Sequence, residues 1–165
     1  MAETKHDAVW AWLKGCPYIK DLFFNFSQVQ NGGTALSPLT AYNDTVVAEY
    51  TGGASLRQYD FTLIRFEACG FEPNERCNLE VLCDVERIAS WADEQAAQGK
   101  LPAFPEGYTI TGLEVLPSNT GYLAGMDGES AKYMLQFRIE YLKGGRGVPP
   151  LKSPCAPQKA RRQNL

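Results

Sequence analysis

AKYMLQFRIEYL, from Ala131 to Leu142, is the stretch that decides the fold. Apolar and mostly polar positions alternate through it, with Ala131, Tyr133, Leu135, Phe137, Ile139 and Tyr141 set against Lys132, Met134, Gln136, Arg138 and Glu140. A period of two is typical of a β-strand that has one face in a core, and a helix would not arrange these residues so. At about 3.3 Å per residue the strand is about 40 Å long. We therefore expect it to cross the whole domain and to offer a long apolar strip that other elements cover.

Composition predicts a globular protein of one domain. The chain has 165 residues, of which 44% are hydrophobic and 12% aromatic, and a domain of this size buries roughly 70% of the surface of its unfolded chain. Its five cysteines are irregularly spaced, and no basic-then-apolar leader precedes them, so we expect a reducing compartment such as the cytoplasm. No apolar run approaches the roughly 20 residues that span a bilayer. We therefore expect no membrane partner.

Charge divides the chain into an acidic body and a basic end. The net charge is −3, and residues 144–165 contain five basic and no acidic residues, so residues 1–143 carry −8. The basic residues are Arg146, Lys152, Lys159, Arg161 and Arg162. Four prolines and several glycines in this end cannot bury enough apolar surface to fold alone. The sequence predicts a single α+β domain over 1–143, followed by an extended, basic, Pro/Gly-rich arm over 144–165.

The order of the predicted elements is α-β-β-β-α-β-β. Capping residues, apolar periodicity and turn residues place them at Thr4 to Lys14 (helix), Leu22 to Val29, Thr45 to Tyr50 and Tyr59 to Ala68 (strands), Pro73 to Gln98 (main helix), and Tyr108 to Leu116 and Ala131 to Leu142 (strands). This order predicts an α+β fold, with a mainly antiparallel sheet of about five strands and helices packed on one face.

Three segments leave questions for the structure. Gln30 to Asn43 is expected as a long loop with a role at a surface, and Pro117 to Ser130 as a long loop that returns to the last strand. In Tyr59 to Ala68, Phe61 and Leu63 point to one face while Ile64 and Phe66 point to the other. Either both faces of that strand are covered, or a bulge reverses its parity near Leu63.

The sequence carries few groups that could perform chemistry. It contains no phosphate-binding or dinucleotide-binding glycine motif, no H-E-x-x-H and no G-x-S-x-G. His6 is the only histidine, and no C-x-x-C exists, which argues against a catalytic triad or a zinc site. The acidic pairs Asp93 with Glu94 and Asp127 with Glu129 are more typical of solvated surface charge. We expect no catalytic, metal-binding or cofactor-binding residue, and hence not an enzyme.

A family resemblance adds to this interpretation. YTGGASLRQYDFTL at Tyr50 to Leu63, the helix with Leu82 and Trp91, TITGLEVLP at Thr109 to Pro117 and AKYMLQFRIEY at Ala131 to Tyr141 resemble the tail-terminator family of tailed bacteriophages, often called minor capsid proteins in phages and prophages of Gram-positive bacteria. The resemblance covers about residues 5–142. It implies a virion protein, made in the cytoplasm of a host bacterium, that forms a hexameric ring on the end of the tail tube, stops tube growth and meets the head-completion proteins.

Candidate contact residues follow from the loops and the charges. We expect the assembly interface to include Gly52, Gly53, Arg57, Asp60, Asp127 and Glu129. The arm, through its five basic residues, could contact an acidic surface of a neighbouring protein or DNA in the channel, or it could be an idle end. Two other functions stay open: another neck or head-completion protein, or a small α+β enzyme or ligand-binding domain with a site between the main helix and the loop at 117–130.

Overall fold

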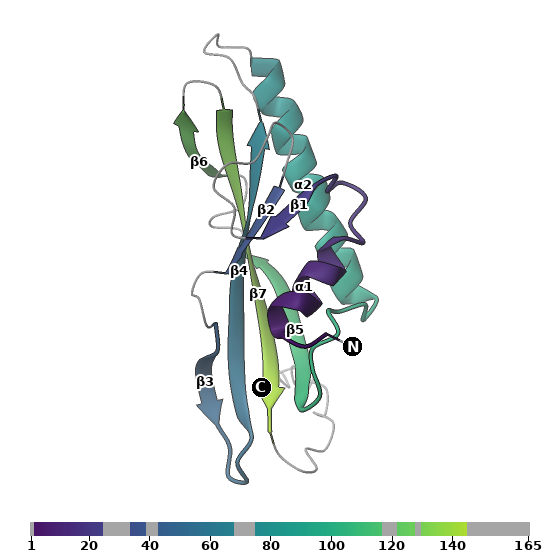
Figure 1. Cartoon of the computed structure of the whole chain (residues 1–165), viewed down its shortest axis with the longest axis vertical. Coiled ribbons are helices and arrows are strands. Elements are labelled where there is room, and N and C mark those ends of the chain that lie inside the picture. Colours follow the sequence, from purple (N-terminus) through teal and green to yellow (C-terminus); the bar gives the residue numbers. More distant parts are fainter. Residues whose placement is uncertain are drawn as a thin grey trace, which may run out of the picture.

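The computed structural model describes residues 2–24, 34–38, 43–67, 75–116, 122–127 and 130–144. Two helices and seven strands follow one another along an elongated molecule (Figure 1). They are α1 (Lys5–Leu13), β1 (Leu22–Phe24), β2 (Thr34–Pro38), β3 (Thr45–Glu49), β4 (Ser55–Glu67), α2 (Glu75–Ala97), β5 (Tyr108–Leu116), β6 (Tyr122–Asp127) and β7 (Ser130–Lys143). Neither helix has the length and apolar character that crossing a membrane requires, as far as the described residues go.

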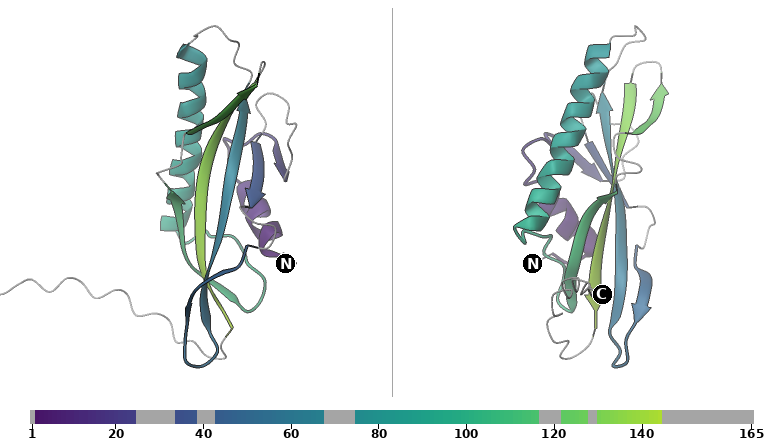
Figure 2. Two further views of the ribbon diagram at one scale, coloured as in Figure 1. Left: turned by 90° about the vertical axis from the view of Figure 1, so that its left-hand side faces the viewer. Right: turned by 180° about the vertical axis from the view of Figure 1, so that it is seen from behind.

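The sheet is built around two long strands, β4 and β7. They pair antiparallel from Ser55 opposite Lys143 to Glu67 opposite Ala131, without a shift in register. The sheet order is β1-β2-β4-β7-β5, with β3 added to β4 and β6 added to β7. Within the described ranges, β1 and β2 form the one parallel pair and the other strand pairs are antiparallel. Figure 2 shows that the β4–β7 pair runs most of the length of the molecule and twists strongly. The shorter strands β2, β3, β5 and β6 pair with β4 or β7 along only part of this length.

Both helices cover the same face of this sheet, as the sequence predicts. On that face Phe61 of β4 lies opposite Phe137 of β7, and their rings stack 4.9 Å apart at an angle of 8°. Apolar residues of α1 and α2 join the same buried cluster, through Val9, Leu13, Val81, Val85, Ile88 and Ala92. Burial alternates along β7, since Leu135, Phe137 and Ile139 are fully buried while Lys132, Arg138 and Glu140 are only partly so. The α+β fold with a mainly antiparallel sheet is confirmed.

Two expected loops contain strands, so the sheet has seven strands instead of about five. β2 lies inside Gln30 to Asn43 and pairs with β4, and β6 lies inside Pro117 to Ser130 and pairs with β7. The local sequences TALSP and YLAGMD contain serine, glycine and proline, which have little preference for strands. Pairing with a long neighbouring strand overrides that local preference. The end of the predicted strand Leu22 to Val29, beyond Phe24, lies outside the described residues.

The uncertain parity of β4 is resolved by its regular register with β7. Because no bulge interrupts that pairing, Phe61 and Leu63 face the helices while Ile64 and Phe66 face the other side. Phe66 is nevertheless only 4% exposed. The first of the two alternatives is therefore correct: apolar residues are covered on both faces of this strand.

Candidate assembly surface

The β3–β4 hairpin forms one end of the molecule (Figure 1). Its turn is closed by two backbone hydrogen bonds, from Tyr50 N to Ala54 O at 2.8 Å and from Gly53 N to Tyr50 O at 3.2 Å. Gly52 and Gly53 have φ angles of 122° and 84°. Residues with a Cβ atom rarely adopt such positive φ angles, whereas glycine adopts them readily. A turn at these two glycines thus joins β3 to β4, and its backbone conformation explains why glycine occupies both positions.

The outer edge of this hairpin is open and apolar. Among the described residues β3 pairs only with β4, so the other edge of its backbone has no partner strand there. Three large apolar side chains are exposed on it: Val46 at 44%, Val47 at 48% and Tyr50 at 49%. The register shifts between Val46 and Ala48. An open edge with exposed apolar side chains is a template for pairing with another chain.

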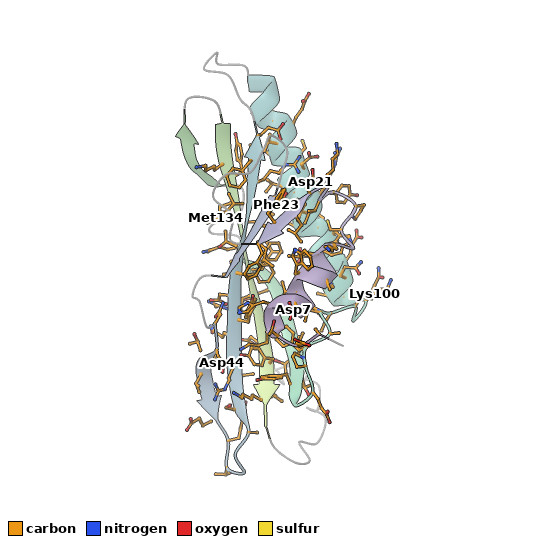
Figure 3. All side chains as sticks on the ribbon, viewed as in Figure 1. Asp7, Asp21, Phe23, Asp44, Lys100 and Met134 are labelled. Atoms are coloured by element: carbon orange, nitrogen blue, oxygen red, sulfur yellow. The ribbon has the colours of Figure 1, made fainter. Side chains whose placement is uncertain are left out.

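A buried charge cluster lies at the base of the hairpin, around Asp44 (Figure 3). We call Lys5, Asp44, Arg57, Tyr141 and Lys143 the Asp44 cluster. The Asp44 carboxylate, whose side chain is 1% exposed, accepts from Lys5 Nζ at 3.0 Å and from Arg57 Nη1 at 2.6 Å, and it lies 3.5 Å from Lys143 Nζ. Tyr141 Oη also donates to it, and accepts from Lys5 Nζ at 2.8 Å. One carboxylate therefore joins α1, β4 and β7 to the start of β3.

The electrostatics of the cluster reflect its burial. Burial lowers the pKa of Lys5 below its ordinary value, although the hydrogen bond to Asp44 acts in the opposite direction. Burial also raises the pKa of Tyr141, and its hydrogen bond to Asp44 raises it further. With the tyrosine neutral, the cluster has three cations and one carboxylate and carries an excess of positive charge. It holds the hairpin against α1 and β7, because the buried Asp44 carboxylate would otherwise lack the partners that compensate its charge.

The predicted contact residues Arg57 and Asp60 make contacts within the chain and lie on opposite faces of β4. Arg57 belongs to the Asp44 cluster and also donates from Nε to Ser55 Oγ at 2.8 Å. Asp60 lies on the face away from the helices, where Arg138 donates to both of its carboxylate oxygens at 2.9 and 3.0 Å. The hydrogen bond to Asp60 raises the pKa of Arg138. Their proposed role in an interface stays a prediction.

Most of the other predicted contact residues lie outside the described residues. Asp127 ends β6 and pairs with Ser130 of β7, and its side chain is outside the described part. Glu129 and the arm residues, Arg146, Lys152, Lys159, Arg161 and Arg162, lie outside the described residues. Of the predicted interface residues, the structure describes Gly52 and Gly53 in the hairpin turn and Arg57 and Asp60 on β4, and a role in assembly stays a prediction for all six. The structure adds three exposed apolar residues on this hairpin, Val46, Val47 and Tyr50, which the sequence analysis did not single out.

His6, the only histidine of the chain, is packed into the fold. Its Nδ1 lies 2.6 Å from Tyr59 Oη, and its ring contacts those of Phe24 and Tyr59. Burial, and secondarily the nearby charge of Lys5, lowers the pKa of His6. The capping box formed by Thr4 and Asp7 explains this position, because it sets the start of α1 and turns the histidine toward β4.

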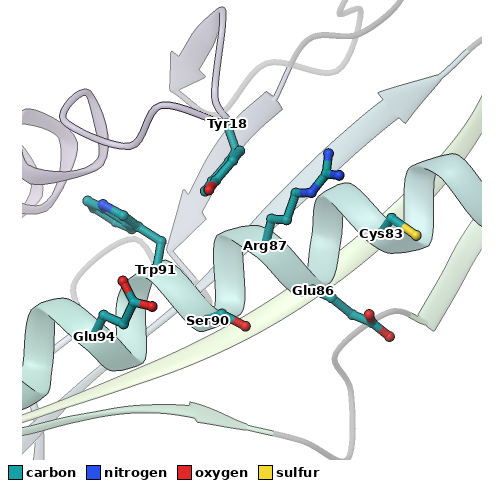
Figure 4. Close-up of a pocket in the computed structure, with 7 residues that line it drawn as sticks. All are labelled: Tyr18, Cys83, Glu86, Arg87, Ser90, Trp91 and Glu94. Carbon is teal, nitrogen blue, oxygen red and sulfur yellow. The ribbon is translucent and has the colours of Figure 1, made fainter.

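The described surface also has two adjoining hollows, both on the outer face of α2. The better formed of them has a volume of about 320 Å³ and lies between α2 and Tyr18 (Figure 4). The alternative ligand site was expected between the main helix and the loop at 117–130, and residues 117–121 and 128–129 of that loop lie outside the described residues. Within the described residues no group of three or more His, Cys, Asp or Glu could hold a metal ion.

No protein-family model matches the chain, and no curated protein matches it either.

Proposed function

We propose that the chain is a structural virion protein of the tail-terminator type, which forms a homo-oligomeric ring, caps the phage tail tube and joins the tail to the head-completion proteins. One observation carries the proposal: the open edge of β3 exposes Val46, Val47 and Tyr50 on a hairpin that the buried Asp44 cluster holds in place. A surface of this kind is typical of contact between protein chains.

A ring needs two different surfaces on each subunit, because in a head-to-tail contact one patch of a subunit binds a different patch of the next subunit. In the half of the sheet that contains β3, the order is β3-β4-β7-β5. Among the described residues β5 pairs only with β7, so β5 is the opposite edge. Addition of β3 from one copy to β5 of the next would continue the sheet across the contact, through backbone hydrogen bonds.

The resemblance in sequence supports the more specific role. Tyr50 to Leu63 forms the turn of the hairpin and most of β4, while Thr109 to Pro117 and Ala131 to Tyr141 cover β5 and β7. The resemblance therefore falls on the turn that follows β3, on the edge strand β5 and on the long strands β4 and β7. The partners that follow are other copies of the chain, the tail tube protein and a head-completion or neck protein, with DNA a possible partner in the channel. The location that follows is the tail and neck region of the virion.

The test changes the open edge and leaves the core alone. In Val46→Lys/Val47→Lys, two exposed apolar side chains become charged, and lysines on an edge strand oppose the addition of another strand. We expect the parent to sediment as a ring and the variant as a folded monomer with one cooperative urea transition. Phe23→Lys is the matched control, since Phe23 is 40% exposed on the edge strand β1, and it should leave the ring intact.

Electron microscopy tests whether the ring caps the tail tube. Negative-stain images of the parent mixed with purified tail tubes should show capped ends, and the edge variant should leave the ends bare. Rings that persist in Val46→Lys/Val47→Lys would show that β3 is not the contact. A parent that stays monomeric at high concentration and leaves tube ends bare would overturn the proposed function.

A further inference from the structure

We infer that the C-terminal segment, residues 145–165, binds along the outer face of α2 on a neighbouring copy, in the hollow beside Tyr18. This inference rests on the proposed ring, which supplies the neighbouring copy. The inference assigns a binding site to the basic arm, which the proposed capping of the tail tube does not do.

The hollow has aromatic walls that are held in place. Tyr18 is 40% exposed at one side of it, and Trp91 of α2 lies at the other (Figure 4). The Trp91 ring packs against that of Trp12, with centroids 4.7 Å apart, and Trp12 Nε1 donates to Lys100 O at 2.9 Å. Because these contacts fix Trp91, the hollow is preformed and a ligand would not have to order it.

The charge of this surface is acidic. α2 contains six acidic and two basic residues, a net charge of −4. Glu86 and Glu94 line the hollow beside Arg87, and Arg87 already donates to Asp84 at 3.1 Å. A second hollow, of about 450 Å³, continues along the helix toward its start and shares Cys83 and Arg87 with the first. The two together form an acidic track along α2.

Residues 145–165 match this track in chemistry. They contain five basic residues, no acidic residue and four prolines, among them VPPLK at Val148 to Lys152. Proline-rich segments favour an extended backbone, and aromatic-lined grooves recognise such segments through their proline rings. The basic side chains complement Glu86 and Glu94, and that attraction should weaken with salt.

The position of Gly144 indicates which copy is reached. Gly144 N donates to Gly107 O at 3.2 Å, and a Cβ atom on Gly144 would lie 3.2 Å from Gly53 O. The segment therefore leaves the body beside the β3–β4 turn, where the proposed contact with the next copy lies. An extended segment gains about 3.1 Å per residue, so it can span roughly 60 Å from this point.

Native cysteines provide a direct test in the full chain. Cys83 is exposed in the hollow, and Cys155 lies in the segment. A short bismaleimide should join Cys83 of one copy to Cys155 of another, and mass spectrometry of peptides from mixed ¹⁴N- and ¹⁵N-labelled chains identifies links between copies. The link should disappear in Cys155→Ser. It should fall about fivefold in Glu86→Lys/Glu94→Lys, since exposed ion pairs are worth up to about 1 kcal/mol each.

Controls separate this contact from chance and from the ring itself. Asp93→Lys changes the charge of α2 by the same amount as each of the two glutamate substitutions. Because Asp93 does not line the hollow, this variant should leave the yield of the link unchanged. Arg161→Glu/Arg162→Glu, introduced into the parent, should lower the yield of the link. Combined with Glu86→Lys/Glu94→Lys, it should restore the yield, because the two charge reversals compensate each other. A link of equal yield in all variants, links only within one copy, or no link would overturn the inference. Rings without the link overturn the arm contact alone, whereas a monomeric parent overturns the ring.

Discussion

Asp44 shows how one side chain joins parts of the chain that are far apart in sequence. Its carboxylate contacts Lys5 of α1, Arg57 of β4 and Lys143 of β7. The Lys5 side chain is only 10% exposed and that of Asp44 is 1% exposed. Removal of one partner from a buried ion pair leaves an uncompensated charge, which water cannot reach. Asp44 should therefore contribute far more to stability than an exposed carboxylate does.

Asp44→Asn keeps the shape of the side chain and removes its charge. We expect it to lower the free energy of unfolding by about 3 to 5 kcal/mol, the usual loss when a buried ion pair is broken. Asp60→Asn is the matched control, because its partner Arg138 is 31% exposed and such pairs are worth about 1 kcal/mol or less. Urea unfolding of the full chain measures both, and equal losses would contradict the assignment of Asp44 as the buried partner.

At the scale of one element, β7 determines which face of the sheet is covered. Phe137 is fully buried and stacks on Phe61, while Glu140 is partly exposed on the other face. The alternation follows because successive side chains of a strand point to opposite faces. Truncation of Phe137 must therefore leave a cavity, whereas truncation of the partly exposed Glu140 leaves none.

Phe137→Ala should lower the free energy of unfolding by about 3 to 5 kcal/mol, since a large cavity forms in the core. Glu140→Ala, three positions along the same strand, should stay within about 0.5 kcal/mol. Denaturant unfolding followed by circular dichroism compares the two variants. Similar losses from both would mean that β7 is not covered on one face as described.

At the scale of the whole molecule, one core joins the helices to the sheet. The buried cluster includes Leu13 of α1, Ile88 of α2, Leu63 of β4 and Leu135 of β7. A shared core of this kind predicts that the elements unfold together. The single domain over 1–143 stays a prediction, and its test is the cooperativity of unfolding.

All three tryptophans, Trp10, Trp12 and Trp91, lie on the helices, so their fluorescence reports the helical layer. Circular dichroism near 218 nm reports chiefly the sheet. We expect the two urea transitions of the parent to coincide, because the layers share one core. The Val46→Lys/Val47→Lys variant, measured in parallel, separates dissociation of the proposed ring from unfolding. A helical transition at lower urea than the sheet transition would contradict a single cooperative domain.

Local sequence was sufficient for the strongest elements. The alternation at Ala131 to Leu142 predicted both the strand and its buried face, and the apolar spacing from Val81 to Ala92 predicted the buried stripe of α2. The turn at Gly52 and Gly53 was also predictable. In each case the information is local, because the geometry of one element decides which of its side chains share a face.

Tertiary structure decided the rest. TALSP and YLAGMD become strands only because β4 and β7 offer them partners, so no local pattern marks them. The Asp44 cluster unites Lys5, Asp44 and Lys143, which lie 39 and 99 positions apart, and the chain folds them together only when α1 packs on the sheet. The hollow beside Tyr18 likewise needs α2 and the segment after α1 in one place. Such sites depend on contacts between elements, and the period of a single element does not encode which other element will lie beside it.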